Sequence, residues 1–146
     1  KALAQFICDV CKKTLQTVPD DPYEVVDRLL NENPPELEVS TDLYGMRGQQ
    51  RTGGAISGIT PENFNLSSLV HGFVEGMAKD ALQMLALFPS DLLSGKHHIV
   101  LSGNAIRKNP KLAIALSQNS PLPAKVCQTR EEAAFGAAKS SLLIDI

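Results

Sequence analysis

The chain has 146 residues, of which 43% are hydrophobic and none is tryptophan, and its formal net charge is −2 at neutral pH. This length and composition are typical of one folded domain with a hydrophobic core. A near-neutral charge without blocks of like charge argues against nucleic acid or an anionic membrane surface as a partner. No run reaches the roughly 18 consecutive apolar residues of a membrane-spanning helix. We therefore expect a cytoplasmic protein.

Two helices are predicted at the start of the chain. Apolar residues recur at helical spacing from Ala2 to about Thr17, and no Ser, Thr, Asp or Asn precedes this helix as a cap. A helix that begins at the first residue without a cap suggests that the sequence is part of a longer protein. Asp21 and Pro22 have the chemistry of a cap and a first helical residue, and Pro34 prevents the second helix from continuing.

The middle of the chain predicts a strand followed by the longest helix. Residues 37–43 alternate as a strand does, and residues 45–58 include five glycines, which indicates an irregular loop or a hairpin. Residues 66–88 repeat apolar side chains at helical spacing and end at Pro89. The small residues along this helix are Gly72, Gly76, Ala78 and Ala81. A helix accepts them where a neighbour packs very close, so we expect it to be buried against a sheet.

The last third of the chain alternates strand and helix. Strands are predicted at 99–101 and 124–127, and helices at 110–118 and from residue 131 onward. Thr129 and Glu132 form a capping box for the final helix. This alternation implies parallel neighbouring strands with a right-handed crossover.

The stretch HHIVLSGNAIRKNP at 97–110 is the strongest candidate for a ligand site. Ligands of open α/β sheets bind beyond the carboxyl ends of the strands, where Gly103 stands. Glycine lets a ligand approach the main chain, and the N-terminus of a helix beginning at Pro110 would favour an anion. Asn104 and Asn109 could hydrogen-bond a ribose, a base or a phosphate. The alternative is that Ser-Gly-Asn is only a turn and Asn109 only a helix cap, which the pattern by itself favours.

Cysteine and histidine residues do not predict a metal site. Cys8 and Cys11 lie one turn apart on a predicted helix, and Cys127 is the only other thiol. His97 and His98 would point to opposite faces of a strand, so four ligands for zinc are not assembled. We expect reduced cysteines and no metal bound by protein side chains.

Four segments together resemble the second half of the FGGY carbohydrate kinases. They are GAISGITPENF at 54–64, LVHGFVEGMA at 69–78, VLSGNAIRKNP at 100–110 and EEAAFGAA at 131–138. Their order and separations match the family's pattern over about 100 residues. The stretch from Leu43 to Arg47 and the loop after residue 101 are most similar to sedoheptulokinases.

The resemblance implies an α/β fold: an incomplete ribonuclease H-like domain of the actin-like ATPase type, with a mixed sheet and flanking helices. It also implies an ATP site. Gly103 would approach the phosphates, with Asn104 in place of the family's second glycine and Ala105 following it. Asn109 would face the adenine, and Gln5 resembles a glutamine near the nucleotide. Glu75 and Gly76 match the long-helix motif, where His71 replaces an arginine.

For function, the resemblance implies transfer of the γ-phosphoryl group of ATP, with Mg²⁺, to a sugar hydroxyl, and sedoheptulose is the finer expectation. The catalytic base and the sugar-reading residues would belong to a first kinase domain upstream of Lys1, so no catalytic residue is assigned here. We expect the fragment alone to be inactive, and its uncovered apolar face could support a homo-oligomer. Two alternatives stay open: an NADP-binding module that uses Arg130, and a purely structural or interaction domain. Glu75, His71, Arg47 and Arg51 are expected to have structural or solvated roles.

Overall fold

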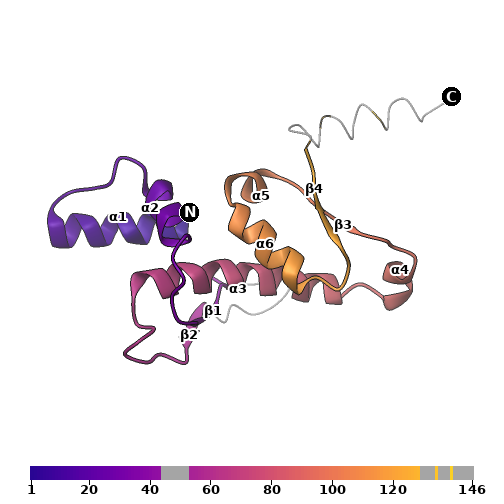
Figure 1. Cartoon of the computed structure of the whole chain (residues 1–146), viewed down its shortest axis with the longest axis horizontal. Coiled ribbons are helices and arrows are strands. Elements are labelled where there is room, and N and C mark those ends of the chain that lie inside the picture. The colour runs from indigo at the N-terminus through magenta and orange to yellow at the C-terminus, as the bar shows by residue number, and fades with distance from the viewer. Residues whose placement is uncertain (44–52, 129–133, 135–138, 140–146) are drawn as a thin grey trace. The chain divides into compact units, whose positions relative to one another are not determined.

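The computed structural model describes residues 1–43, 53–128, 134 and 139. The chain divides into two compact units, Lys1–Leu87 and Phe88–Ile146. Each unit is an α/β arrangement with a small sheet, as Figure 1 shows in sequence colours. The mixed α/β character expected from the sequence is confirmed. The sheets of the described residues, however, are two separate two-stranded ones, antiparallel in the first unit and parallel in the second, where the sequence predicted one mixed sheet.

The first unit contains α1 (Ala2–Leu15), α2 (Pro22–Leu29), β1 (Glu38–Ser40), β2 (Ala55–Ser57) and α3 (Leu66–Ala86). The cap predicted at Asp21 is present. The Tyr23 backbone N–H donates to Asp21 Oδ1 at 2.7 Å, which starts α2. No side chain caps α1, which ends two residues earlier than predicted because Gln16 adopts a left-handed conformation with φ of 55°.

The long helix α3 packs directly on β1, as its small residues predicted. A Cβ atom added at Gly72 would lie 2.5 Å from the Leu37 carbonyl oxygen, and one at Gly76 would overlap the Val39 carbonyl oxygen. Ala78 is fully buried. β1 pairs antiparallel with β2 through Val39 and Ile56, so of the two predictions for residues 45–58, a loop or a hairpin, the structure shows the second strand of a hairpin. Residues 44–52, with Arg47 and Arg51, lie outside the described residues.

The second unit contains α4 (Ser90–Ser94), β3 (Ile99–Leu101), α5 (Asn104–Lys108), α6 (Pro110–Asn119) and β4 (Ala124–Val126). β3 and β4 are parallel neighbours, with Ile99 opposite Ala124 and Leu101 opposite Val126, so the predicted strand–helix–strand unit is confirmed. Its buried apolar residues are Leu101, Ile106, Leu112, Ala113, Ala115 and Leu116. The expected final helix and its capping box at Thr129 and Glu132 fall outside the described residues.

Two short helices, α4 and α5, were not predicted. Each has five residues, which is too short to show a helical period in the sequence. α5 changes the candidate site, because it lies between Gly103 and the helix that begins at Pro110.

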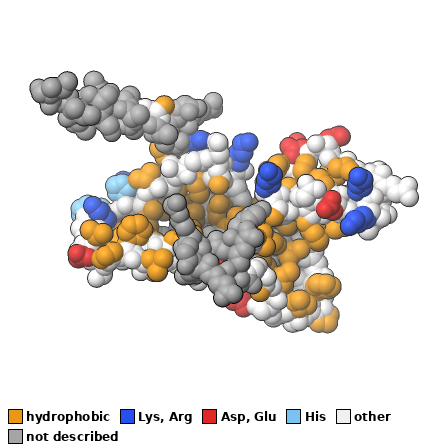
Figure 2. Space-filling view, turned by 180° about the vertical axis from the view of Figure 1, so that it is seen from behind, with side chains coloured by type: hydrophobic (Ala, Val, Ile, Leu, Met, Phe, Trp, Pro, Cys, Tyr) orange, Lys and Arg blue, Asp and Glu red, His pale blue; other side chains and the backbone are white. Residues whose placement is uncertain are grey.

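On the face that Figure 2 displays, the Lys and Arg side chains of the described residues lie scattered among apolar and acidic ones. No described helix has both the length and the apolar character needed to cross a membrane. Within the described ranges, no group of three or more His, Cys, Asp or Glu side chains is placed to hold a metal ion, and all three cysteines are free thiols.

Candidate ligand site

The turn after β3 leaves open space in front of its glycine. β3 ends at the buried Leu101, and the Cys127 backbone N–H donates to its carbonyl at 2.8 Å, which extends the pairing with β4. Gly103 follows with φ of 95°, a conformation that other residues rarely adopt. A Cβ atom built there would meet nothing within 4 Å. Space for a neighbouring group is therefore present on the side of Gly103 where a side chain would stand, and the ligand contact expected from the sequence stays a prediction.

Asn104 and Ala105 begin α5, and both side chains are exposed. Arg107 Nη2 donates to Asn104 Oδ1 at 2.9 Å. The Arg107 backbone N–H donates to the Gly103 carbonyl at 3.2 Å. Asn104 is thus a partner for an arginine whose place in the site the sequence had not indicated.

Asn109 acts as the cap of α6. The Leu112 backbone N–H lies 3.1 Å from Asn109 Oδ1, and the Asn109 carbonyl accepts from the Ala113 N–H at 3.4 Å. Pro110, the first residue of α6, has no N–H to offer. The N-terminus of α6 therefore offers an anion fewer main-chain donors than we predicted from the sequence.

A hollow of about 590 Å³ lies within the second unit, between α5, α6 and the end of β4. Its lining residues are Ile106, Arg107, Pro110, Ala113, Ile114, Val126, Cys127 and Gln128. We call this hollow the α5–α6 groove. Its volume is in the range of small-molecule sites, and its lining is mainly apolar, as in most such sites.

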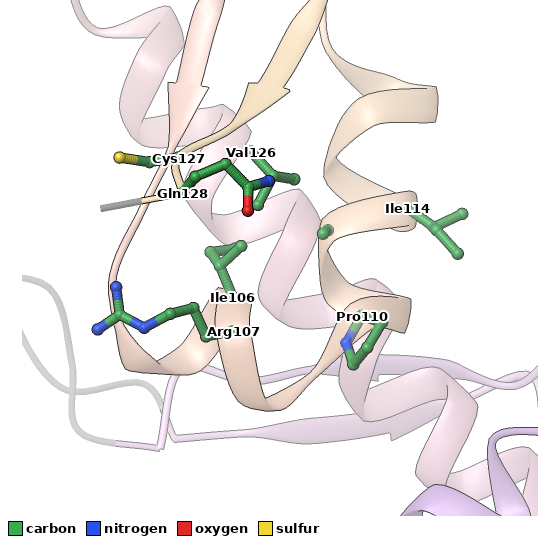
Figure 3. A pocket seen from close by; sticks show the side chains of 8 residues that line it. Ile106, Arg107, Pro110, Ile114, Val126, Cys127 and Gln128 are labelled. Carbon is green, nitrogen blue, oxygen red and sulfur yellow. The ribbon is translucent and has the colours of Figure 1, made fainter. Parts of the chain in front are cut away.

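Figure 3 shows how the side chains of the α5–α6 groove are arranged. Ile106, Val126 and Gln128 lie near one another, and Ile114 points away from them on the outer side of α6. Arg107 extends toward the chain that follows β3. The groove therefore has an apolar middle and a cationic end beside the turn that contains Gly103.

The sequence predicts the turn after β3 but not most of the residues that line the groove. The sequence does not single out Ile106, Arg107, Val126 or Gln128 as site residues. The available signal was weak, since an apolar residue beside a basic one on a short helix is common on any amphipathic surface.

Gln5 does not share a unit with the other four predicted residues. It lies exposed on α1 in the first unit, and its Nε2 donates to Asp9 Oδ1 at 3.2 Å. Gly103, Asn104, Ala105 and Asn109 all lie in the second unit within seven residues of sequence.

Of the two other motif residues on α3, His71 has a structural contact and Glu75 is exposed. His71 is half-buried, and its Nε2 hydrogen-bonds with the Leu29 carbonyl at 3.2 Å, which ties α3 to α2. Glu75 is exposed, so the buried, paired carboxylate that we expected is not what the structure shows.

Comparison with known proteins finds a solved structure of similar fold. No family model matches the sequence, and neither does any curated protein. A solved structure from Brucella ovis described as a xyloylose kinase matches with a TM-score of 0.67 and 20% sequence identity. The match covers 97% of this chain and 28% of that one. The chain therefore has the fold of a part of that kinase and spans little more than a quarter of its length.

Proposed function

We propose that this chain is the nucleotide-binding part of a sugar kinase of the FGGY type, with the ribonuclease H-like architecture of actin-like ATPases. The observation that carries the proposal is the α5–α6 groove, which lies beside an open glycine turn at the carboxyl end of β3. This is where α/β sheets bind nucleotides. The fold likeness to a xyloylose kinase supports the same assignment. The finer proposal, from the sequence motifs, is that the acceptor sugar is sedoheptulose.

The chemistry of the groove suits a purine nucleotide. A flat, weakly polar ring gains from contact with Ile106, Pro110 and Val126, while Gln128 offers an amide that can donate and accept at the ring edge. Nothing lies within 4 Å of a Cβ atom built at Gly103, which leaves space beside the place proposed for the phosphates. In phosphoryl transfer, positioning and charge stabilisation supply most of the catalysis. This chain would contribute positioning of ATP.

Mg²⁺ does not fit the groove as a directly bound ion. Mg²⁺ prefers oxygen ligands, chiefly carboxylates and phosphates, and none of the lining residues that the structure describes is Asp or Glu. We therefore expect Mg²⁺ to arrive with ATP and to find its protein ligands elsewhere in the enzyme. The catalytic base and the sugar site are likewise proposed to belong to a further kinase domain, and this chain by itself is proposed not to phosphorylate a sugar.

Binding of ADP tests the proposal directly, with Val126→Asp and Val100→Asp as a matched pair. Both valines are exposed on the parallel sheet, at 44% and 56% respectively, but only Val126 lines the groove. A carboxylate at residue 126 would meet the ring and repel the phosphates, so we expect at least a roughly 10-fold loss of ADP affinity by calorimetry, about 1.4 kcal/mol. Val100→Asp should bind as the unaltered chain does.

Other outcomes would assign a different function. If NADP binds and ADP does not, the dinucleotide alternative replaces this proposal. If neither binds while the chain self-associates through apolar surface, an interaction domain is the better description.

A further inference from the structure

Among the described residues that line the α5–α6 groove, Arg107 is the one with a cationic side chain. The remaining lining is apolar apart from the Cys127 thiol and the Gln128 amide. A nucleotide differs from its nucleoside only by its phosphates. Neither an alkyl group nor an amide binds a phosphate strongly enough to favour the nucleotide over the nucleoside. Among the described lining residues, only Arg107 can therefore recognise the charge of the phosphates.

Arg107 is connected to the glycine turn at both its main chain and its side chain. Its backbone N–H donates to the Gly103 carbonyl at 3.2 Å, and its Nη2 donates to Asn104 Oδ1 at 2.9 Å. Asn104 stands three residues earlier, so the two side chains meet on one face of α5. Figure 3 shows the guanidinium directed toward the chain after β3. The charge is thus held beside the turn that contains Gly103, away from the apolar middle of the groove.

The helix ends supply little competing attraction. α5 has only five residues, and α6 begins with Pro110, with the Leu112 N–H already engaged by Asn109. Lys108 is exposed next to Arg107 but does not line the groove. An arginine is also the better phosphate ligand, because its planar fork binds two phosphate oxygens at once.

We infer that Arg107 reads the phosphates of the bound nucleotide and that Asn104 is a positioning residue that orients the Arg107 guanidinium. The inference rests on the proposed nucleotide site and adds its charge-recognising residue. Two consequences follow. Affinity increases from adenosine to AMP to ADP, and this increase depends on Arg107. Asn104, which replaces a glycine of the kinase pattern, acts through Arg107 and does not contact the ligand.

The test is calorimetric titration of the full chain with adenosine, AMP and ADP, for the unaltered protein and three variants. Arg107→Gln removes the charge from the groove, and Lys108→Gln removes the same charge one residue away. Asn104→Ala removes the side-chain acceptor. We expect ADP to bind the unaltered chain at least about 10-fold more tightly than adenosine, a preference typical of a charge-assisted bidentate contact.

Arg107→Gln should reduce this preference to within about 3-fold by weakening ADP alone, and Lys108→Gln should preserve it. Retained adenosine binding in Arg107→Gln shows that the groove is still folded. Asn104→Ala should weaken ADP binding by a smaller factor and leave the affinity for adenosine unchanged. Added to Arg107→Gln in a double variant, it should cause no further loss of ADP affinity, because both changes act through one contact. An additive double variant would overturn the positioning role.

The results separate the inference from the proposed function. If ADP binds the unaltered chain and Arg107→Gln equally well, the nucleotide site stands and the role of Arg107 is refuted. If neither ADP nor adenosine binds the unaltered chain, the proposed function itself is refuted, and the inference with it.

Discussion

Asn63 is the best-connected side chain among the described residues of the first unit. It is 6% exposed in the segment between β2 and α3. Its Nδ2 donates to the Glu36 carbonyl at 2.8 Å and to the Gly58 carbonyl at 2.9 Å, and its Oδ1 accepts from the Thr60 N–H at 2.7 Å. One amide thus joins the chain before β1 to the turn after β2.

The same turn affects Glu62. Its pKa is lowered from the usual 4.5, chiefly because the Thr60 side chain hydrogen-bonds with its carboxylate.

Asn63→Ala should therefore destabilise the first unit. It leaves two carbonyls and one N–H without their protein partner, at a cost of about 2–4 kcal/mol in the free energy of unfolding, measured by urea titration. The matched control is Asn31→Ala, an exposed asparagine, which should change that free energy by less than about 0.5 kcal/mol. Equal effects of the two substitutions would show that the Asn63 bonds do not hold the segment.

At the scale of elements, helix propensity and packing have opposite effects on an alanine placed at residue 72, where α3 contacts β1. We expect the packing effect to be the larger one. Alanine favours a helix interior over glycine by about 1 kcal/mol. A Cβ at residue 72, however, would lie 2.5 Å from the Leu37 carbonyl oxygen and 2.6 Å from Val39 Cγ2. Because that oxygen belongs to the backbone of the strand region, it cannot move aside as the end of a flexible side chain can.

Gly72→Ala is expected to lower the free energy of unfolding by about 1–3 kcal/mol, despite the gain in propensity. Gly95→Ala is the control, since Gly95 has φ of −98° and nothing lies within 4 Å of its built Cβ. It should be close to neutral in the same thermal or urea unfolding experiment. A stabilised Gly72→Ala protein would mean that α3 and β1 pack less closely than the structure shows.

The same contact illustrates how far the sequence can predict this fold. The spacing of apolar residues located α3, its glycines predicted a close neighbour, and Asp21, Pro22 and Asn109 located helix starts by chemistry that acts within three or four residues. The sequence did not predict α5, because five residues carry no period. Nor could it predict that Arg107 turns toward Asn104, because that choice depends on where α5 lies against the end of β3.

At the scale of the whole molecule, the fold tolerates much more change than the site. A TM-score of 0.67 at 20% identity means that the main-chain path is kept while most side chains differ. Apolar patterning and close glycines are enough to specify such a path. The proposed nucleotide site instead depends on particular groups in a few places, so we expect substitutions at Asn104 and Arg107 to change nucleotide affinity and to leave the fold unchanged.

Whether the nucleotide contacts one unit or both can be read from backbone hydrogen exchange. Four of the predicted ligand residues lie in the second unit, and Gln5 lies in the first. The motif resemblance assigns all five to one nucleotide site. If all five belong to one nucleotide site, saturating ADP should slow exchange about 10-fold or more from Gly103 to Asn119 and also around Gln5 on α1. The Val126→Asp chain, measured at the same ADP concentration, should show neither effect. If exchange slows in the second unit alone, Gln5 does not belong to the nucleotide site and the groove does. If exchange slows around Gln5 alone, the nucleotide binds away from the groove.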